Sequence, residues 1–142
     1  MKSPTRTEAG PLVYGKVNKR EAAVLEFAKQ VAAVTWDFSA DGGAVGDVTF
    51  GVKLPAGAIV VAVLSDEETA VTGATSITLS AGSTALTGAI NFTSDAGIQS
   101  RDLAGSAAGI KVTSASELKI AIATNPATAG KVTFYVQFLV KA

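Results

Sequence analysis

The residues of this chain best suited to acid–base chemistry are three consecutive carboxylates, Asp66-Glu67-Glu68, which follow an apolar run. A hydrolase that uses paired carboxylates holds them facing each other across a cleft, where one donates a proton and the other attacks or accepts one. Consecutive residues at the end of a strand point in different directions. We therefore expect a solvated loop here, with an acid–base pair as the alternative.

A second acidic group, Asp37, Asp41 and Asp47, flanks a Gly-rich turn. Together with backbone carbonyl oxygens, aspartates could hold a calcium ion. Their spacing does not match the EF-hand loop, and aspartate is a common turn residue because its side chain accepts hydrogen bonds from nearby amides. We favour a role in the turn, and no metal site is predicted.

Cysteine and histidine are both absent from the 142 residues. Their absence removes thiol nucleophiles, imidazole bases and the ligands that most zinc, iron and copper sites require. The nucleophile-elbow motif G-x-S-x-G and both nucleotide-binding fingerprints are missing as well. The sequence therefore predicts a protein that is not an enzyme and that uses no cofactor.

The charge and hydropathy of the chain argue against two kinds of partner. Twelve basic and twelve acidic residues cancel to a formal net charge of zero, which gives no overall attraction to nucleic acid or to an anionic membrane. The longest apolar run, Ala58 to Leu64, is too short to cross a bilayer. Because residues 1–20 contain no apolar core of a secretory signal, we expect synthesis in a cytoplasm.

Period-two patterns predict that most of the chain forms β-strands. Val48, Phe50 and Val52 alternate with polar or small residues, and apolar residues from Val132 to Val140 recur in the same way. The run from Ala58 to Leu64 contains no polar residue, which is typical of a strand that is covered on both faces.

About eight such strands, separated by regularly spaced turns, indicate an all-β fold. We predict an antiparallel β-sandwich of jelly-roll type that spans residues 31–142. Large apolar side chains stabilise a core by roughly 1.5 to 3 kcal/mol each when buried. Those expected in this core are Trp36, Phe50, Phe92, Phe134 and Phe138.

Residues 1–30 differ from the rest in charge, and we predict that they form an extended basic arm. Met1 to Lys29 contain six basic and three acidic residues, a formal +3, which leaves −3 for the remainder. Asn18 and Glu21 resemble a capping box, and apolar residues then recur at helical spacing, which favours a short helix over residues 18–30. A frayed terminus is the alternative. The residues expected to contact a partner are Leu12, Val13, Tyr14, Lys16, Lys19 and Arg20.

Three stretches of the chain carry a resemblance to known proteins: VTFGVKLPAGAIVVAVLSDEETAVTG, the TSITLSAGSTALTG that soon follows it, and the terminal strand KVTFYVQFLV. They resemble small virion proteins of tailed bacteriophages, of the capsid decoration or cement type. The resemblance covers residues 34–142.

This resemblance implies a structural virion protein, made in the host cytoplasm, that binds the outer surface of the capsid and clamps neighbouring subunits of the major capsid protein. It also implies a homo-oligomer, with a trimer favoured. On this hypothesis the apolar arm residues pack on the capsid or on a sister subunit, and the basic ones meet an acidic surface there. The alternative is a trimeric receptor-binding or fibre-head domain that recognises the host surface.

Overall fold

The computed structural model describes residues 27–73, 75–92 and 97–141. Within these residues the chain forms nine strands, one short α-helix and one 3₁₀ helix. The helix α2 covers Phe38–Asp41, and the 3₁₀ helix η1 covers Ala104–Ser106. The strands are β1 (Phe27–Asp37), β2 (Gly46–Leu54), β3 (Ile59–Thr72), β4 (Ser76–Ala81), β5 (Thr84–Ala85), β6 (Gly97–Arg101), β7 (Ile110–Lys111), β8 (Ser116–Ala123) and β9 (Ala129–Lys141).

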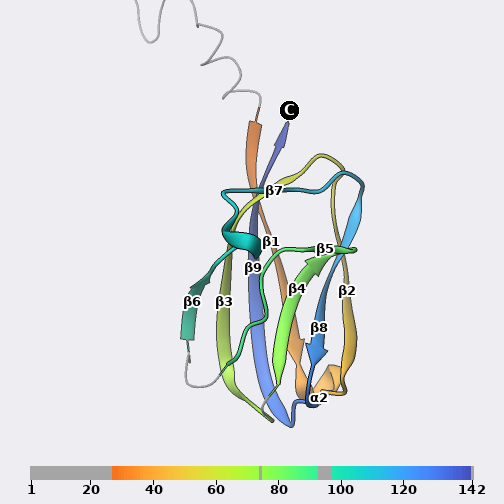
Figure 1. The fold of residues 1–142 in the computed structure, drawn as a ribbon, viewed down its shortest axis with the longest axis vertical. Coiled ribbons are helices and arrows are strands. Elements are labelled where there is room, and N and C mark those ends of the chain that lie inside the picture. The colour runs from red at the N-terminus through yellow and green to blue at the C-terminus, as the bar shows by residue number, and fades with distance from the viewer. Residues whose placement is uncertain (1–26, 74, 93–96, 142) are drawn as a thin grey trace, which may run out of the picture. The chain divides into compact units, whose positions relative to one another are not determined.

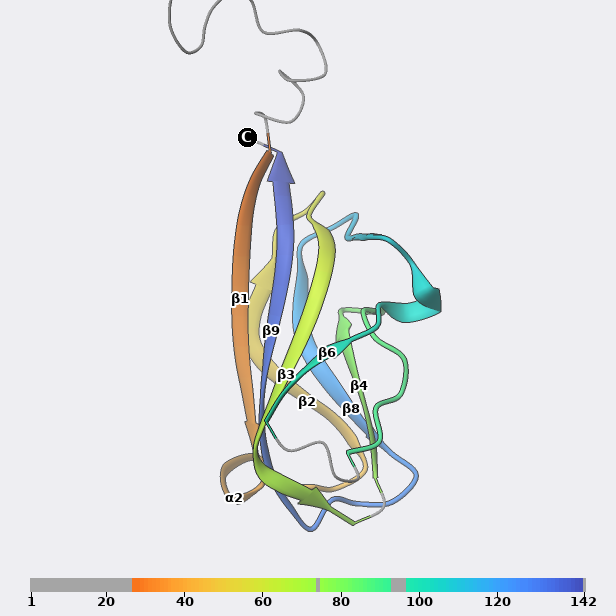
Figure 2. The same cartoon turned by 90° about the vertical axis from the view of Figure 1, so that its left-hand side faces the viewer.

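The strands form two sheets that face each other (Figures 1 and 2). The first sheet has the order β1-β9-β3-β6, with β7 also paired to β3, and the second has the order β2-β8-β4-β5. β3 runs antiparallel to β6, β7 and β9, and β8 runs antiparallel to β2 and β4. The predicted all-β, antiparallel sandwich is therefore confirmed, and most consecutive strands alternate between the sheets, as in a jelly roll.

The core lies between the sheets and is built from the inward row of each strand. Trp36 and Phe134 are fully buried, and Phe92 and Phe138 are nearly so. Phe50 is partly buried and packs against the same cluster. The rings of Phe92 and Phe134 meet edge to face, with their centroids 6.4 Å apart. From the second sheet the core receives Ile77, Leu79, Leu118, Ile120 and Ile122.

A bulge in β3 decides which of its apolar residues reach the core. The register of β3 against β9 shifts between Val60 and Ala62, so Val61 is an extra residue without a direct partner. Val60 and Val63 are consequently both buried although they lie three residues apart. Within the described residues, one row of Ala58 to Leu64 reaches the core, and the other row stays half-buried on the outer surface of the sheet. The predicted cover on this second face, by the same subunit or by a neighbour, stays a prediction.

The strand β1 corrects part of the predicted helix over residues 18–30. Residues 27–30 belong to β1, while residues 18–26 lie outside the described part of the chain. β9 is 13 residues long and offers β1 a partner along its length. Pairing of this kind outweighs the local helix propensity of an Ala-rich stretch. The division of the chain into arm and sandwich domain stays a prediction.

The helix α2 joins the first sheet to the second. Asp37 caps it, because the Asp37 carboxylate accepts a hydrogen bond from the Ser39 amide at 3.0 Å. Trp36 Nε1 donates to the carbonyl of Gly42 at 2.9 Å, which fastens the end of the turn to the core.

Candidate interaction surface

The side chains on the outer face of the β2-β8-β4-β5 sheet are polar or small. Asp47 lies on β2 and pairs across the strands with Lys119 of β8, whose Nζ is 3.0 Å from Asp47 Oδ2. β4 presents the hydroxyl side chains Ser76, Thr78 and Ser80 between its buried residues. A face of this kind is well solvated and gives an apolar partner little to bind.

The outer face of the β1-β9-β3-β6 sheet is different, because it carries an apolar patch. Leu64 of β3 lies opposite Tyr135 of β9, and Ile59 lies opposite Leu139. Residues directly opposite each other in a sheet share a face, and the alternate residues of β9 point into the core. All four are half-buried, and we call them the outer apolar patch.

Two exposed aliphatic side chains extend this apolar character on either side of the outer apolar patch. Val31 on β1 is 55% exposed, and Ile98 on β6 is 67% exposed. The described part of the chain forms two layers only, and no element of it lies over this face (Figures 1 and 2). Exposed apolar surface with a polar rim is typical of protein–protein contact sites.

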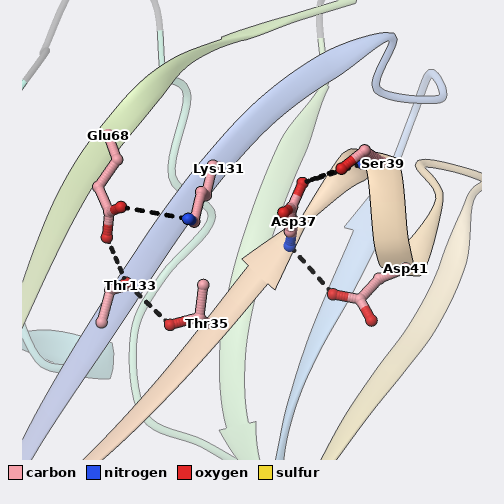
Figure 3. A network of polar contacts seen from close by, with 7 residues as sticks. All are labelled: Thr35, Asp37, Ser39, Asp41, Glu68, Lys131 and Thr133. Atoms are coloured by element: carbon pink, nitrogen blue, oxygen red, sulfur yellow. Dashed lines mark hydrogen bonds and ion pairs between the residues drawn. The ribbon is translucent and has the colours of Figure 1, made fainter.

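A chain of polar contacts crosses three strands toward the other end of the same face (Figure 3). The Thr133 hydroxyl of β9 donates to Glu68 Oε2 of β3 at 2.8 Å, and it accepts from the Thr35 hydroxyl of β1 at 2.9 Å. Lys131 Nζ lies 3.6 Å from Glu68 Oε1, and both side chains are 40% exposed. An exposed ion pair contributes little, so the network chiefly ties β1, β9 and β3 together.

The three aspartates considered for calcium do not form one group of ligands in the described residues, although Asp37 and Asp41 lie close together. Asp37 Oδ1 accepts hydrogen bonds from the hydroxyl and the amide of Ser39. Both bonds lower the pKa of Asp37, and the bond from the hydroxyl has the larger effect. Asp41 Oδ2 accepts from the Asp37 amide, whereas Asp47 pairs with Lys119. The described residues contain no group of three or more acidic side chains placed to hold a metal ion.

The Asp66-Glu67-Glu68 cluster is divided between the two faces of β3. Glu67 points inward, is 6% exposed, and accepts a hydrogen bond from the Val71 amide at 2.7 Å. Glu68 points outward into the polar network of Figure 3. The cluster therefore lies within a strand and not in the loop that the sequence led us to expect.

One S-x-x-K spacing, from Ser116 to Lys119, bears on the prediction that the chain is not an enzyme. This spacing is visible in the sequence itself. It supplies a nucleophile and its base where both residues share a helix face. Here both lie in β8, where residues three apart point to opposite faces. Ser116 Oγ instead donates to the carbonyl of Ser114 at 2.8 Å.

A pocket of about 410 Å³ lies between residues 87–91 and residues 100–106. Arg101 is the charged group nearest the core here: its Nε donates to Ser65 Oγ at 2.7 Å, and its guanidinium lies 4.9 Å from the ring centroid of Phe92. These contacts hold β6 against β3 and the core, so Arg101 acts in packing.

The six arm residues, Leu12, Val13, Tyr14, Lys16, Lys19 and Arg20, lie outside the described residues. Their predicted contacts stay predictions. In the described part of the chain, no helix is long and apolar enough to span a membrane.

Comparison with known proteins gives matches among solved structures. No family model matches the chain, and no curated protein matches it. A chain of the cyanophage Pam1 capsid asymmetric unit matches with a TM-score of 0.58 and 19% identity, over 96% of this chain and 97% of that one. A chain of the acidic stable capsid structure of Helicobacter pylori bacteriophage KHP30 matches with a TM-score of 0.59 and 15% identity, over 80% of this chain and 89% of that one. At these identities the matches show a shared fold.

Proposed function

We propose that this protein is a structural component of a bacteriophage virion that binds the outer surface of the capsid and clamps neighbouring subunits of the major capsid protein. The observation that carries the proposal is the match to a chain of the Pam1 capsid, because nearly all of both chains is covered. The KHP30 match supports the same class of protein.

The outer apolar patch is the surface of the described chain that best fits contact with a capsid. Burying apolar surface stabilises a complex by roughly 25 cal/mol per Å². The patch places four large side chains on one face, as two cross-strand pairs on either side of Gln137. The outer face of the other sheet is polar and suits exposure to solvent. This difference between the two faces is what a subunit lying on a shell requires.

The arm and the oligomeric state complete the proposal. Leu12, Val13 and Tyr14 pack on the capsid or on a sister subunit, and the neighbouring basic residues, Lys16, Lys19 and Arg20, meet an acidic surface there. A homo-oligomer, with a trimer favoured, makes several such contacts at once, which raises the overall affinity without any new kind of contact.

Co-sedimentation with emptied phage heads and with intact host cells, each at low and raised salt, tests the proposal. We expect saturable binding to heads that weakens with salt. Leu64→Glu places a charge in the outer apolar patch and should weaken binding by about tenfold or more. Thr78→Glu, on the polar face of the other sheet, is the matched control and should bind as the wild type does.

Two outcomes would contradict parts of the proposal. Binding to cells and not to heads would favour the receptor-binding alternative. If deletion of residues 1–17 leaves the occupancy of the heads unchanged, the contacts proposed for that part of the arm are wrong. The Leu64→Glu variant then tests the role of the outer apolar patch separately.

A further inference from the structure

Among the described residues, β1 is an open edge of its sheet. It is 11 residues long, and in the described chain it has a strand neighbour, β9, on one side only. Figure 2 shows it at the margin of the sandwich, with α2 next to its C-terminal end. Residues 30–36, QVAAVTW, contain no charge, no proline and no glycine. An open edge of this composition is prone to pair with another strand.

The other edges are protected by devices that β1 lacks. β2 has an irregular register against β8 between Thr49 and Lys53, where Gly51 has a φ of 73° and its amide is bonded to Glu117 Oε2 at 2.8 Å. β6 has five residues and β5 has two. Bulges, charges and short length are the usual means by which proteins prevent edge pairing, so β1 stands out as the edge left available.

The backbone of β1 presents its odd-numbered residues to this open edge. The amide of Asp37 donates to Asp41 Oδ2 at 3.0 Å, so this amide is bonded within its own turn and not to β9. In an antiparallel ladder the amide and carbonyl groups of alternate residues point to the same side. Those of Thr35, Ala33 and Val31 therefore point outward. The side chains of these three residues lie on the outer face, as the Thr35–Thr133 hydrogen bond shows.

We propose that β1 pairs antiparallel with β1 of a second copy of this chain, about a two-fold axis at Ala33. In this register Ala33 faces its own equivalent, so the smallest side chain of the row lies at the axis. Val31 then faces the partner's Thr35, and Thr35 faces the partner's Val31. Together with the pair at Ala33 these make three residue pairs, and each pair exchanges two backbone hydrogen bonds, about six in all.

Charge complementarity selects the second copy and this register. Lys29 is exposed at one end of the outer row, and Asp37 lies at the other end. The two-fold axis at Ala33 places Lys29 opposite the partner's Asp37, and Asp37 opposite the partner's Lys29. A register shifted by two residues in either direction loses both of these opposite-charge pairs. The helix α2 follows Asp37 directly and ends the pairing there.

This pairing is separate from the proposed binding to a capsid. A two-fold contact converts a monomer into a dimer, and it converts a trimer into a hexamer where the two-fold axis is perpendicular to the three-fold axis and meets it. Its test needs no phage heads, and its failure would leave the binding of heads unaffected.

Sedimentation velocity of the full chain over a range of concentrations tests the proposal. Lys29→Glu places a carboxylate opposite the partner's Asp37, and Asp37→Lys places two lysines opposite each other. Each variant alone should associate about fourfold more weakly or worse, since two pairs change from attraction to repulsion. An equal mixture of the two variants should recover association, because the glutamate introduced in one variant then faces the lysine introduced in the other across the axis.

Ala33→Lys supplies a second, independent test. It places two lysines at the two-fold axis and should weaken the association of two copies through β1, which we call the doubling step, by about fourfold or more. Thr49→Lys on β2, the edge strand of the other sheet, is the matched control and should leave association unchanged. Circular dichroism of each variant establishes that the sandwich is folded. Absence of the doubling step in the wild type, or association that neither Ala33→Lys nor the charge variants alter, would overturn the proposal.

Discussion

Gly130→Ala tests how closely the backbone of β9 packs against Trp36 in the core. Gly130 lies in β9 with a φ of 142°, a conformation that side chains with a Cβ rarely adopt. A Cβ at this position would lie 2.9 Å from Trp36 Cζ3 and 2.9 Å from Val71 Cγ2. The substitution therefore imposes a strained backbone and overpacks a part of the core that is already full.

The expected loss of stability follows from these two costs. A strained φ costs about 1–3 kcal/mol, and an extra carbon in a packed core costs about 1–3 kcal/mol. We expect Gly130→Ala to lower the free energy of unfolding by about 2–6 kcal/mol. Gly51→Ala is the matched control, since Gly51 also has a positive φ, 73°, but a Cβ there meets no atom within 4 Å. It should cost about 1–2 kcal/mol.

Urea unfolding followed by tryptophan fluorescence measures both variants, because the chain contains one tryptophan and it is fully buried. With a slope of about 2 kcal/mol per M, a 2 kcal/mol difference between the variants separates their midpoints by about 1 M. Equal losses for Gly130→Ala and Gly51→Ala would refute the steric part of the reasoning. A Gly130→Ala variant as stable as the wild type would refute both parts.

Two further predictions concern the turn at α2. The Ser39 hydrogen bonds lower the folded-state pKa of Asp37 below 3.8, so the stability that Asp37 contributes is present above that pH and is lost as the pH falls through the lower, folded value. Asp37→Asn should therefore be less stable than the wild type near neutral pH and approach it in acid; a gap that is constant from pH 7 to pH 2 in thermal melts would contradict this. Trp36→Phe removes the hydrogen bond from Nε1 to the Gly42 carbonyl. It should lower the free energy of unfolding by about 1–3 kcal/mol, measured by urea unfolding and circular dichroism. A loss below about 0.5 kcal/mol would mean that this hydrogen bond does not hold the turn.

The strands of the sandwich could be predicted because alternation is a local property of the sequence. β9 and β2 each show a period of two, and in both the apolar row is the one that turns toward the core. The start of β1 could not be predicted in the same way. Its apolar residues fit a helical spacing as well as a strand, and only pairing with β9 decides between the two.

The candidate surfaces were less predictable than the fold. The outer apolar patch depends on the register of β3 against β9, which brings Leu64 beside Tyr135 across a separation of about seventy residues. The open edge of β1 depends on strand order, which no local pattern contains. The polar network likewise joins Thr35, Glu68 and Thr133 from three separate strands.

The sequence by itself determined that this chain builds an antiparallel β-sandwich, because period-two apolar rows can be buried only by a second layer, and that it lacks thiol and imidazole chemistry, because it contains no cysteine or histidine. The tertiary structure alone decided which apolar residues are left on the surface. The bulge at Val61 changes the row of β3 that the core receives, and the uniformly apolar run that contains it does not specify that shift. Long-range pairing therefore determined the surface to which the proposed contact with a capsid is assigned.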